Sequence, residues 1–324
     1  MQYRTAKGFS GSASLGILFA LVGVGLILTG ISQFLIAFSF LPAGTGIDRM
    51  EEVLKKAIAD PANVKFVIAM QAVGTLLLMF IPARLFSLIV HGKSWHWLGI
   101  NRHFNYMQVL LAFLIIFAAN FAAIPFDQFT RSCVSHFPAV FKKAIQMESD
   151  YATQVEILGS LRSVSGFFIG LFIIALLPAF FEEVFFRGVI QDLFTRWWGR
   201  PFIAILITSL FFSLVHGSVF LFLSRAVLGI ALGLIYYYTR NVWVSFLAHF
   251  INNALAFSQL FFSGGKTSAM DEGTGNILLD WTAAIIAIVV SVLLFRFLKK
   301  RSEVCVAAIQ QKEYLTRVPS YHFE

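Results

Sequence analysis

The sequence predicts an all-α fold: a polytopic membrane helix bundle of about eight transmembrane helices with short amphipathic surface helices. Composition is the first reason, because 58% of the 324 residues are hydrophobic and 13% are charged, against about 45–50% and about 25% in soluble domains. The second reason is that apolar runs close to the 20 residues that cross a bilayer recur along the chain. They fall near residues 15–38, 64–90, 106–126, 164–181, 202–223, 226–239, 242–263 and 278–298.

The distribution of charge predicts the orientation of these spans. Eight spans place both termini on one side, and a cytoplasmic assignment puts the excess of Lys and Arg inside, as the positive-inside rule expects. The first apolar stretch is too long for a signal-peptide core, so we expect it to be kept as a span. These features predict a multi-pass protein of the cell (plasma) membrane with both termini cytoplasmic. The net charge of +8 fits basic cytoplasmic ends, and no nucleic-acid partner is expected.

The segments between the spans predict how the chain is divided. Residues 43–63 and 127–163 contain the amphipathic patterns MEEVLKKAI and MESDYATQVEIL, which predict surface helices along the membrane. Cys133 and Cys305 fall on opposite sides in this topology, so they are not expected to form a disulfide. The predicted parts are the N-terminal spans 1–3 with outer loops (1–150), a membrane core (151–300) and a polar cytoplasmic tail (301–324).

Ionisable and amide side chains recur on the predicted helices of the second half. A charged group at bilayer depth costs roughly 2.5–3.5 kcal/mol on insertion scales, so such residues usually face the bundle interior and mark functional sites. Glu183 and Arg187 are i and i+4, which makes them neighbours on one helix face. Glu182 points about 100° away and is free to face a different cavity. Pro178 lacks an amide hydrogen and is expected to kink the helix beside the pair. The candidate residues are Glu182, Glu183, Arg187, His216, His249 and Asn253.

The histidines extend this pattern to two further helices. His249 and Asn253 share one face at i and i+4, and Phe212 and His216 repeat the spacing. If the three helices converge, their polar groups surround one pocket, and two chemistries remain open. In the first, Glu182 takes a proton from water that His216 orients, while His249 and Asn253 stabilise an oxyanion. In the second, Glu182, His216 and His249 bind a Zn²⁺ ion that activates the water.

At these residues the sequence resembles a known family, the CAAX protease and bacteriocin-processing (CPBP) intramembrane metalloproteases. The family motifs EExxxR, FxxxH and HxxxN stand here as EEVFFR (182–187), FSLVH (212–216) and HFINN (249–253), in the family's order. The resemblance covers roughly residues 165–262. Each motif alone is weak, but all three in order on apolar helices make a strong signal.

The resemblance implies an intramembrane endopeptidase that hydrolyses a peptide bond near the cytoplasmic membrane face with glutamate-activated water, with a Zn²⁺ cofactor or without a metal. Glu182 would be the general base, Glu183 its partner carboxylate, and Arg187 would fix the pair. The implied substrate is a membrane-associated or lipidated peptide or protein, presented from the lipid bilayer. Eukaryotic members of the family remove the C-terminal tripeptide from prenylated CAAX proteins, and bacterial members are linked to peptide maturation and bacteriocin immunity.

Two other functions fit part of the pattern. Buried Glu, His and Arg also serve a proton-coupled transporter, but such a protein predicts paired repeats, and the polar residues lie only in the second half. A non-catalytic bacteriocin-immunity or peptide-binding membrane protein would use the same pocket without cutting. Signals of other intramembrane proteases are weak: GFSG (8–11) precedes every span, GTGID (44–48) misses the GxGD spacing, and HExxH is absent.

Overall fold

We describe a computed structural model, which covers residues 3–39, 49–50, 52–53, 56–57, 60–158, 163–263 and 276–317. All the secondary-structure elements among these residues are helices. Within them, β-type pairing is confined to an isolated bridge between Arg4 and Ser10. The predicted all-α fold is confirmed.

Several helices join end to end without a loop and form two long rods. The first rod runs from Val64 to Val90 and the second from Val164 to Trp198. The elements are α1 (Gly11–Phe38), η1 (Pro61–Asn63), α3 (Val64–Thr75), η2 (Leu76–Phe80), α4 (Ile81–Val90), η3 (Trp95–Leu98), α5 (Tyr106–Ser135), α6 (Pro138–Leu158), α7 (Val164–Gly170), η4 (Leu171–Leu176), α8 (Leu177–Glu183), η5 (Val184–Gln191), α9 (Asp192–Trp198), α10 (Pro201–Leu214), α11 (Phe222–Thr239), α12 (Val242–Phe262) and α13 (Ile277–Arg317).

Helices occupy all eight ranges that the sequence predicts as spans, and six of the described helices are long and apolar enough to cross a membrane. These six are α1, the two rods, α5, α11 and α13. The predicted span 202–223 is shorter than expected, since α10 has 14 residues and ends at Leu214. The chain turns at Gly217, whose φ of 69° lies in the left-handed region that glycine adopts readily.

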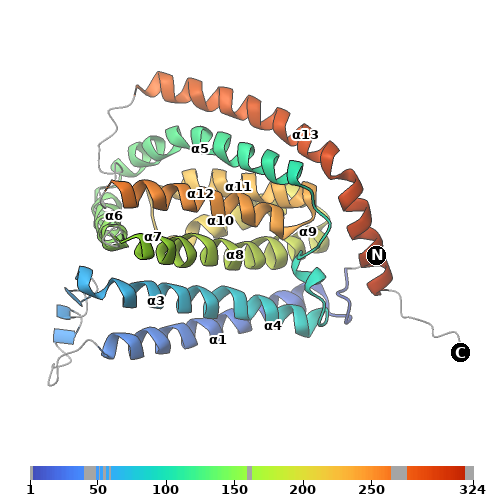
Figure 1. The fold of residues 1–324 in the computed structure, drawn as a ribbon, viewed down its shortest axis with the longest axis horizontal. Helices are drawn as coiled ribbons and strands as arrows, with labels where there is room; N and C mark the ends of the chain where they lie inside the picture. Colours follow the sequence, from blue (N-terminus) through green and yellow to red (C-terminus); the bar gives the residue numbers. More distant parts are fainter. Residues whose placement is uncertain are drawn as a thin grey trace, which may run out of the picture.

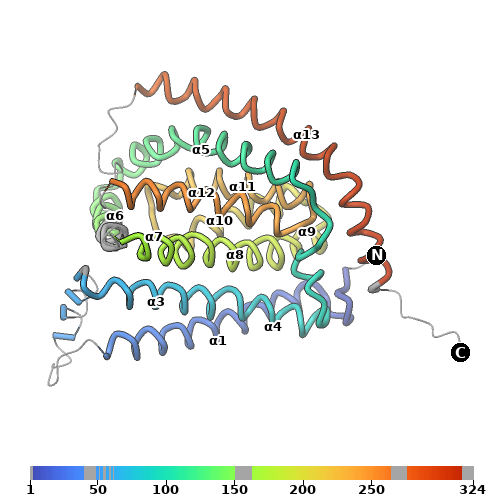
Figure 2. Tube along the Cα trace, viewed as in Figure 1, coloured from blue at the N-terminus to red at the C-terminus, as the bar shows by residue number. Residues whose placement is uncertain are grey.

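The rods and helices pack into a layered bundle (Figure 1). The pair formed by α1 and the α3–α4 rod lies along one side, and α13 lies along the opposite side against α5. Between them lie α7–α9 and the helices α10, α11 and α12 (Figure 2). The beginning of α1 and the end of α13 lie at the same end of the bundle. The central helices, which carry the candidate residues, are thus covered on both sides.

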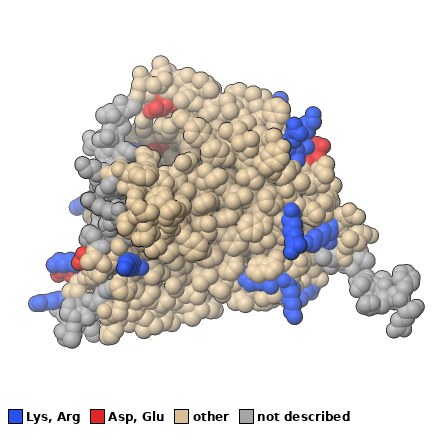
Figure 3. Space-filling view, viewed as in Figure 1, with Lys and Arg blue, Asp and Glu red and all other residues tan. Residues whose placement is uncertain are grey.

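The outer surface of the bundle is suited to lipid. Figure 3 shows one face on which charged side chains gather towards two ends, with a broad uncharged band between them. Large apolar side chains point outward from α1 and α13, among them Phe19, Ile27, Leu278 and Ile285. Since soluble monomers rarely expose contiguous apolar patches of this kind, the surface confirms a multi-pass membrane protein.

Helix α5 crosses the bundle beside α13, and polar bonds join the two helices. A capping box closes its first turn, in which Asn105 and Gln108 exchange hydrogen bonds. Gln108 also donates to Ser302 on α13 over 2.9 Å. Cys305 lies 3.7 Å from Asn105 at this end of α5, whereas Cys133 lies near its other end, about 40 Å away along a helix that rises 1.5 Å per residue. Both cysteines are free, as the sequence predicts.

The amphipathic segments are described only in part. Most of the predicted surface helix around MEEVLKKAI lies outside the described residues. The pattern MESDYATQVEIL forms the second half of α6 (Pro138–Leu158), a helix of 21 residues.

The last helix continues across residue 300 to Arg317, and its end is tied to the bundle by ion pairs. Glu313 accepts a hydrogen bond from Arg196 Nη2 over 3.1 Å and lies 3.8 Å from Arg240 Nη2. Arg196 also donates to Asp192 over 2.6 Å. The segment expected as a polar tail is therefore largely helical and holds α9 and the α11–α12 turn.

His96 adds a titratable group to this cluster. The side chain is buried, its Nδ1 lies 2.7 Å from Asn101 Oδ1, and its Nε2 lies 3.9 Å from Glu313 Oε2. Because the amide oxygen only accepts, Nδ1 donates. Burial is the largest influence and lowers the pKa of His96 below its usual value, although Asn101 and Glu313 oppose this shift.

We expect His96 to make the protein less stable in acid. With a lowered pKa in the folded state, the unfolded chain binds more protons as the pH falls below about 6.5, so the stability that neutral His96 contributes above this pH is lost. Thermal unfolding in detergent between about pH 7.5 and 5 should show a smaller loss on acidification for His96→Gln than for the parent. His103→Gln, a change at an exposed histidine, should follow the parent. Equal pH dependence for both variants and the parent would contradict this account.

Candidate active site

The two candidate glutamates lie at a junction in the second rod where the helix changes its winding. Pro178 is the second residue of α8, which directly follows the π-helical stretch η4. In the first turn of a helical segment, the missing amide hydrogen of proline is tolerated. A second π-helical stretch, η5, begins immediately after Glu183 and contains Arg187. π-helical turns inside α-helices occur frequently at functional sites. The local winding therefore sets the direction of both carboxylates and of the guanidinium.

Glu183 and Arg187 form a fully buried ion pair. Arg187 Nη1 lies 3.2 Å from Glu183 Oε1, and the two side chains are 1% and 0% exposed. The same carboxylate oxygen lies 3.0 Å from His249 Nδ1. One carboxylate thus holds a guanidinium from its own helix and an imidazole from α12, which joins two helices at this point.

Glu182 faces the two histidines. Its Oε2 lies 3.9 Å from Nε2 of His216 and 3.9 Å from Nε2 of His249. This oxygen is buried and makes no hydrogen bond within the described part of the chain. The sequence predicts that the two glutamates face different cavities, but they share His249, one at each ring nitrogen. The reason is that the imidazole lies between the carboxylates and reaches both.

His216 lies just beyond the end of α10, in the turn that Gly217 closes. Its Nδ1 lies 2.7 Å from the carbonyl oxygen of Phe212, so Nδ1 carries the proton and donates. The His216 side chain is 28% exposed, whereas those of Glu182 and His249 are 10% and 7% exposed. The site is therefore most open on the side of His216.

The ring of Phe212 is a common contact for the charged and imidazole groups. The guanidinium carbon of Arg187 lies 4.7 Å from the centre of this ring, within the range of a cation–π interaction. The rings of His216 and His249 lie 4.6 Å and 5.8 Å from it. The first residue of the FxxxH motif therefore supports the histidine at its end through both its ring and its carbonyl oxygen.

Two glycines of α11 complete the environment of Arg187. The spacing of Gly229 and Gly233 predicts close helix packing alone, yet each carbonyl oxygen also accepts a side-chain hydrogen bond. Arg187 Nη2 donates to Gly229 over 3.2 Å, and Gln191 Nε2 donates to Gly233 over 2.8 Å. The two donors, Arg187 and Gln191, are four residues apart, and so are the two acceptors on α11. The two helices are therefore joined by hydrogen bonds over one turn.

Neither glycine has room for a side chain. A Cβ at Gly229 would lie 3.0 Å from Ser209 Cβ, and one at Gly233 would lie 2.9 Å from Ile205 Cγ2. Gln191 is not among the candidates predicted from the sequence, although its spacing from Arg187 equals that of the two glycines.

The turn after His216 is also held by residues that are not among the candidates predicted from the sequence. Ser218 donates to Glu148 on α6 over 2.8 Å, and the rings of Phe220 and Phe141 lie 5.7 Å apart. A polar residue on an amphipathic helix and a serine after a motif histidine carry no sequence signal that would link them. The surface helix α6 thus contacts the open side of the site.

Asn253 is the candidate least connected to the others. It lies half-buried one turn beyond His249 on α12 and makes no hydrogen bond with the residues that the structure describes. Its neighbour Asn252 accepts a hydrogen bond from Asn120 on α5 over 2.7 Å. The structure therefore brings five of the candidates within 4 Å of one another in a chain of contacts, and Asn253 lies one turn away; the five are Glu182, Glu183, Arg187, His216 and His249.

The protonation of the histidines defines what the site can bind. Both Nδ1 atoms donate to acceptors, so a neutral imidazole at either position presents a lone pair at Nε2. Three acceptor atoms, the two Nε2 and Glu182 Oε2, then point towards one place. Such a set favours a proton donor or a cation between them, and the second-sphere acceptors at Nδ1 are typical of metal-binding histidines.

The spacing is wider than that of a formed zinc site. Two ligands of one tetrahedral zinc at about 2.0–2.2 Å from the metal lie roughly 3.3 Å apart, compared with the 3.9 Å seen here. Within the described ranges, no group of three or more His, Cys, Asp or Glu side chains is arranged as a metal-binding cluster. The donor types at Glu182, His216 and His249 nevertheless fit a divalent cation such as Zn²⁺.

Comparison with known proteins agrees with the motifs. Residues 164–255 match the sequence model of the family described as type II CAAX prenyl endopeptidase Rce1-like. The matched segment contains all three motifs, so the family resemblance is confirmed there.

The chain is also similar to one curated protein over part of its length. A stretch of 103 residues is 33% identical to the Bacillus subtilis (strain 168) protein named Uncharacterized protein YpbD, and it covers 31% of this chain and 50% of that protein. The chain therefore spans half the length of this relative. No solved structure matches the chain.

We expect the buried ion pair to be essential for folding. Arg187→Ala strands the Glu183 carboxylate in a dry interior, and breaking a buried pair in this way costs about 3–5 kcal/mol. Thermal unfolding in detergent, with the yield of monodisperse protein, measures the effect. Arg102→Ala removes an exposed guanidinium and should match the parent. An Arg187→Ala protein as stable as this control would contradict the pairing.

Proposed function

We propose that the chain is an intramembrane endopeptidase of the CAAX-protease type. The observation that carries the proposal is the convergence of Glu182 Oε2 with Nε2 of His216 and of His249, at 3.9 Å each, inside a bundle of membrane-crossing helices. The family match over residues 164–255 supports a CAAX-type peptidase in general.

Glu182 is the group suited to take the proton. Its Oε2 is buried and unbonded, whereas Glu183 is already engaged by Arg187 and His249. A water between Oε2 and the two imidazoles would donate to the carboxylate and lie against Nε2 of His216 on the open side. Positioned proton transfer of this kind contributes typically about 10²–10⁴-fold in rate.

Hydrolysis then adds one water across the peptide bond. The water oxygen bonds to the carbonyl carbon while one proton passes to Glu182. The C–N bond breaks as that proton is delivered to the departing amine nitrogen, which returns Glu182 to its ionised state. The products are a carboxylic acid and an amine, so no further reactant is needed.

The oxyanion of the intermediate requires a donor. His249 can supply one only when both ring nitrogens are protonated, since its Nδ1 already donates to Glu183. A carboxylate oxygen lies near each of its ring nitrogens, Glu183 Oε1 at Nδ1 and Glu182 Oε2 at Nε2. Asn253, one turn further along α12, offers an amide hydrogen as a second donor if the substrate reaches it.

A divalent cation such as Zn²⁺ is the alternative source of activation. Glu182, His216 and His249 would hold it, and it would supply Lewis-acid activation of the bound water. Glu183 and the Phe212 carbonyl oxygen would orient the two imidazoles by accepting from their Nδ1 atoms.

The substrate that fits this setting is a membrane-associated or lipidated peptide. The site lies on helices whose outer surfaces are apolar, so a substrate would approach from the bilayer or its surface. We further propose that the chain lies in the plasma membrane with both termini in the cytoplasm, and that cleavage takes place near the cytoplasmic face.

Removal of the Glu182 charge should abolish turnover. Glu182→Gln keeps the size of the side chain but takes up no proton, so we expect at least a hundredfold loss, the lower end of general-base effects. The assay is cleavage of a peptide that ends in a prenylated cysteine and three further residues, with purified protein in lipid vesicles. Glu303→Gln, at an exposed position of α13, is the matched control.

Two outcomes would contradict the peptidase. One is equal cleavage by the parent and Glu182→Gln. The other is a parent that binds the peptide without cutting it, which would favour a peptide-binding or immunity protein.

The metal content of the purified protein distinguishes water activation by Glu182 alone from activation by a bound cation. If a cation is required, the purified parent should hold about one equivalent of Zn²⁺ by elemental analysis, and His249→Ala should hold far less. A chelator should then stop cleavage, and added Zn²⁺ should restore it. Full activity with no bound metal would contradict the metal-assisted form and leave glutamate-activated water.

A further inference from the structure

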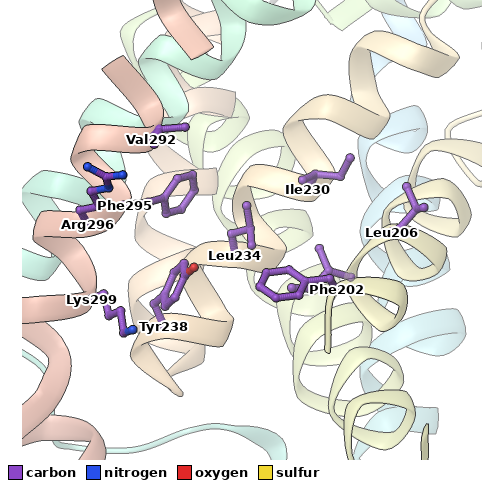
Figure 4. Close-up of a pocket in the computed structure, with 10 residues that line it drawn as sticks. Phe202, Leu206, Ile230, Leu234, Tyr238, Val292, Phe295, Arg296 and Lys299 are labelled. Carbon is purple, nitrogen blue, oxygen red and sulfur yellow. The ribbon is translucent and has the colours of Figure 1, made fainter. Parts of the chain in front are cut away.

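A long groove lies on the outer side of the bundle, away from the candidate active site. It has a volume of about 540 Å³ and is lined by α10, α11 and α13. Figure 4 shows Ile230, Leu234 and Tyr238 of α11 facing Phe295 and Lys299 of α13 across it. None of the six candidate residues lines this groove, so it is a separate feature.

The wall formed by α13 carries two positive charges. Arg296 and Lys299 both line the groove and are exposed. They are i and i+3 on one helix and therefore share a face. Neither makes an ion pair with any residue that the structure describes. A groove that is otherwise mostly apolar and carries these two cations on one wall is suited to a ligand with an anionic group and an apolar tail.

The position of these cations along α13 points to a lipid. From Ile277 to Phe295 the helix is mostly apolar and carries one charged residue, Asp280 near its start. The basic run that contains Arg296 and Lys299 follows directly. Such a change marks the depth at which a membrane helix leaves the hydrocarbon for the headgroups. The apolar part of the groove then lies beside acyl chains, and its basic end lies at the level of lipid phosphates.

We propose that this groove binds an anionic phospholipid. Its acyl chain would lie against Leu206, Ile230 and Leu234, and its phosphate would be bound by Arg296 and Lys299. Basic pockets between membrane helices are suited to acidic headgroups, and arginine can hold a phosphate in a bidentate manner.

The lipid would contact α10 and α11, two helices that support residues of the candidate active site. Ile205 lines the groove and also packs against Gly233, whose carbonyl oxygen accepts from Gln191. Helix α10, on the same wall, ends directly before His216. A lipid in the groove therefore fixes α10 and α11 against α13 and stabilises the scaffold of the site.

The test uses the full-length protein in nanodiscs of neutral phosphatidylcholine with increasing phosphatidylglycerol. Bound lipid is measured by native mass spectrometry, and stability is measured by thermal unfolding. The variant R296Q/K299Q removes the two charges of the groove. K300Q/R301Q removes the same charge from the next two positions of α13, which do not line the groove, and is the matched control.

We expect the parent and K300Q/R301Q to retain phosphatidylglycerol and to unfold at a higher temperature in its presence. R296Q/K299Q should bind this lipid roughly thirtyfold more weakly, from the usual contribution of a basic residue at a membrane surface. Inorganic phosphate should not displace the lipid from the parent, because it lacks the acyl chain.

Three results would overturn the proposal. One is an equal loss of lipid binding in both double variants, which would reflect the general surface charge of α13. The second is retention of phosphatidylcholine as strong as that of phosphatidylglycerol. The third is displacement of the lipid by inorganic phosphate, which would show that the two cations bind an anion without any contribution from the apolar lining of the groove.

Discussion

The buried contact of Glu183 with Arg187 and His249 is the interaction on which the rest of the site depends. Removing two charges from water is costly, and their attraction offsets this cost only with close geometry and further hydrogen bonds. Here the carboxylate binds both partners through Oε1, and the guanidinium also reaches a backbone carbonyl oxygen and an aromatic face. Because His249 is held at Nδ1, its Nε2 faces Glu182. The Glu183–Arg187 pair therefore fixes the orientation of the His249 ring, although neither of its own side chains takes part in the proposed proton transfer.

Backbone features support this arrangement as much as side chains do. The π-helical winding that starts after Glu183 aims Arg187 at α11, and Gly229 lets that helix approach closely enough to offer its carbonyl oxygen. On the other side, the turn at Gly217 ends α10 so that His216 lies beyond the helix, with Nδ1 bound to the carbonyl oxygen of Phe212. The first two motifs thus depend on local backbone features, the π-helical winding after Glu183 and the turn at Gly217, and α11 adds a close approach at Gly229.

The sequence predicts much of this site because its signals are local. The i, i+4 spacing identifies the Glu183–Arg187 pair, and the apolar runs locate the helices that carry it. Contacts between distant segments leave no such local pattern, and for this reason the sequence does not indicate the roles of Gln191, Glu148 and Glu313. Residue spacing on one helix also suggested separate surroundings for the two glutamates, whereas an imidazole from α12 brings them together. The sequence does not indicate the end of α10, because the apolar residues continue across the turn at Gly217.

An experimental map of the protein in lipid at a resolution that shows ordered waters tests the central claim most directly. The account predicts density for a water or an ion between Glu182 Oε2 and the Nε2 atoms of His216 and His249, within about 2.6–3.2 Å of each for a water or about 2.0–2.2 Å for a zinc. It also predicts that Glu183 lies at the opposite nitrogen of His249. A map in which Glu182 turns away from both imidazoles, or in which His249 is released from Glu183, would contradict it.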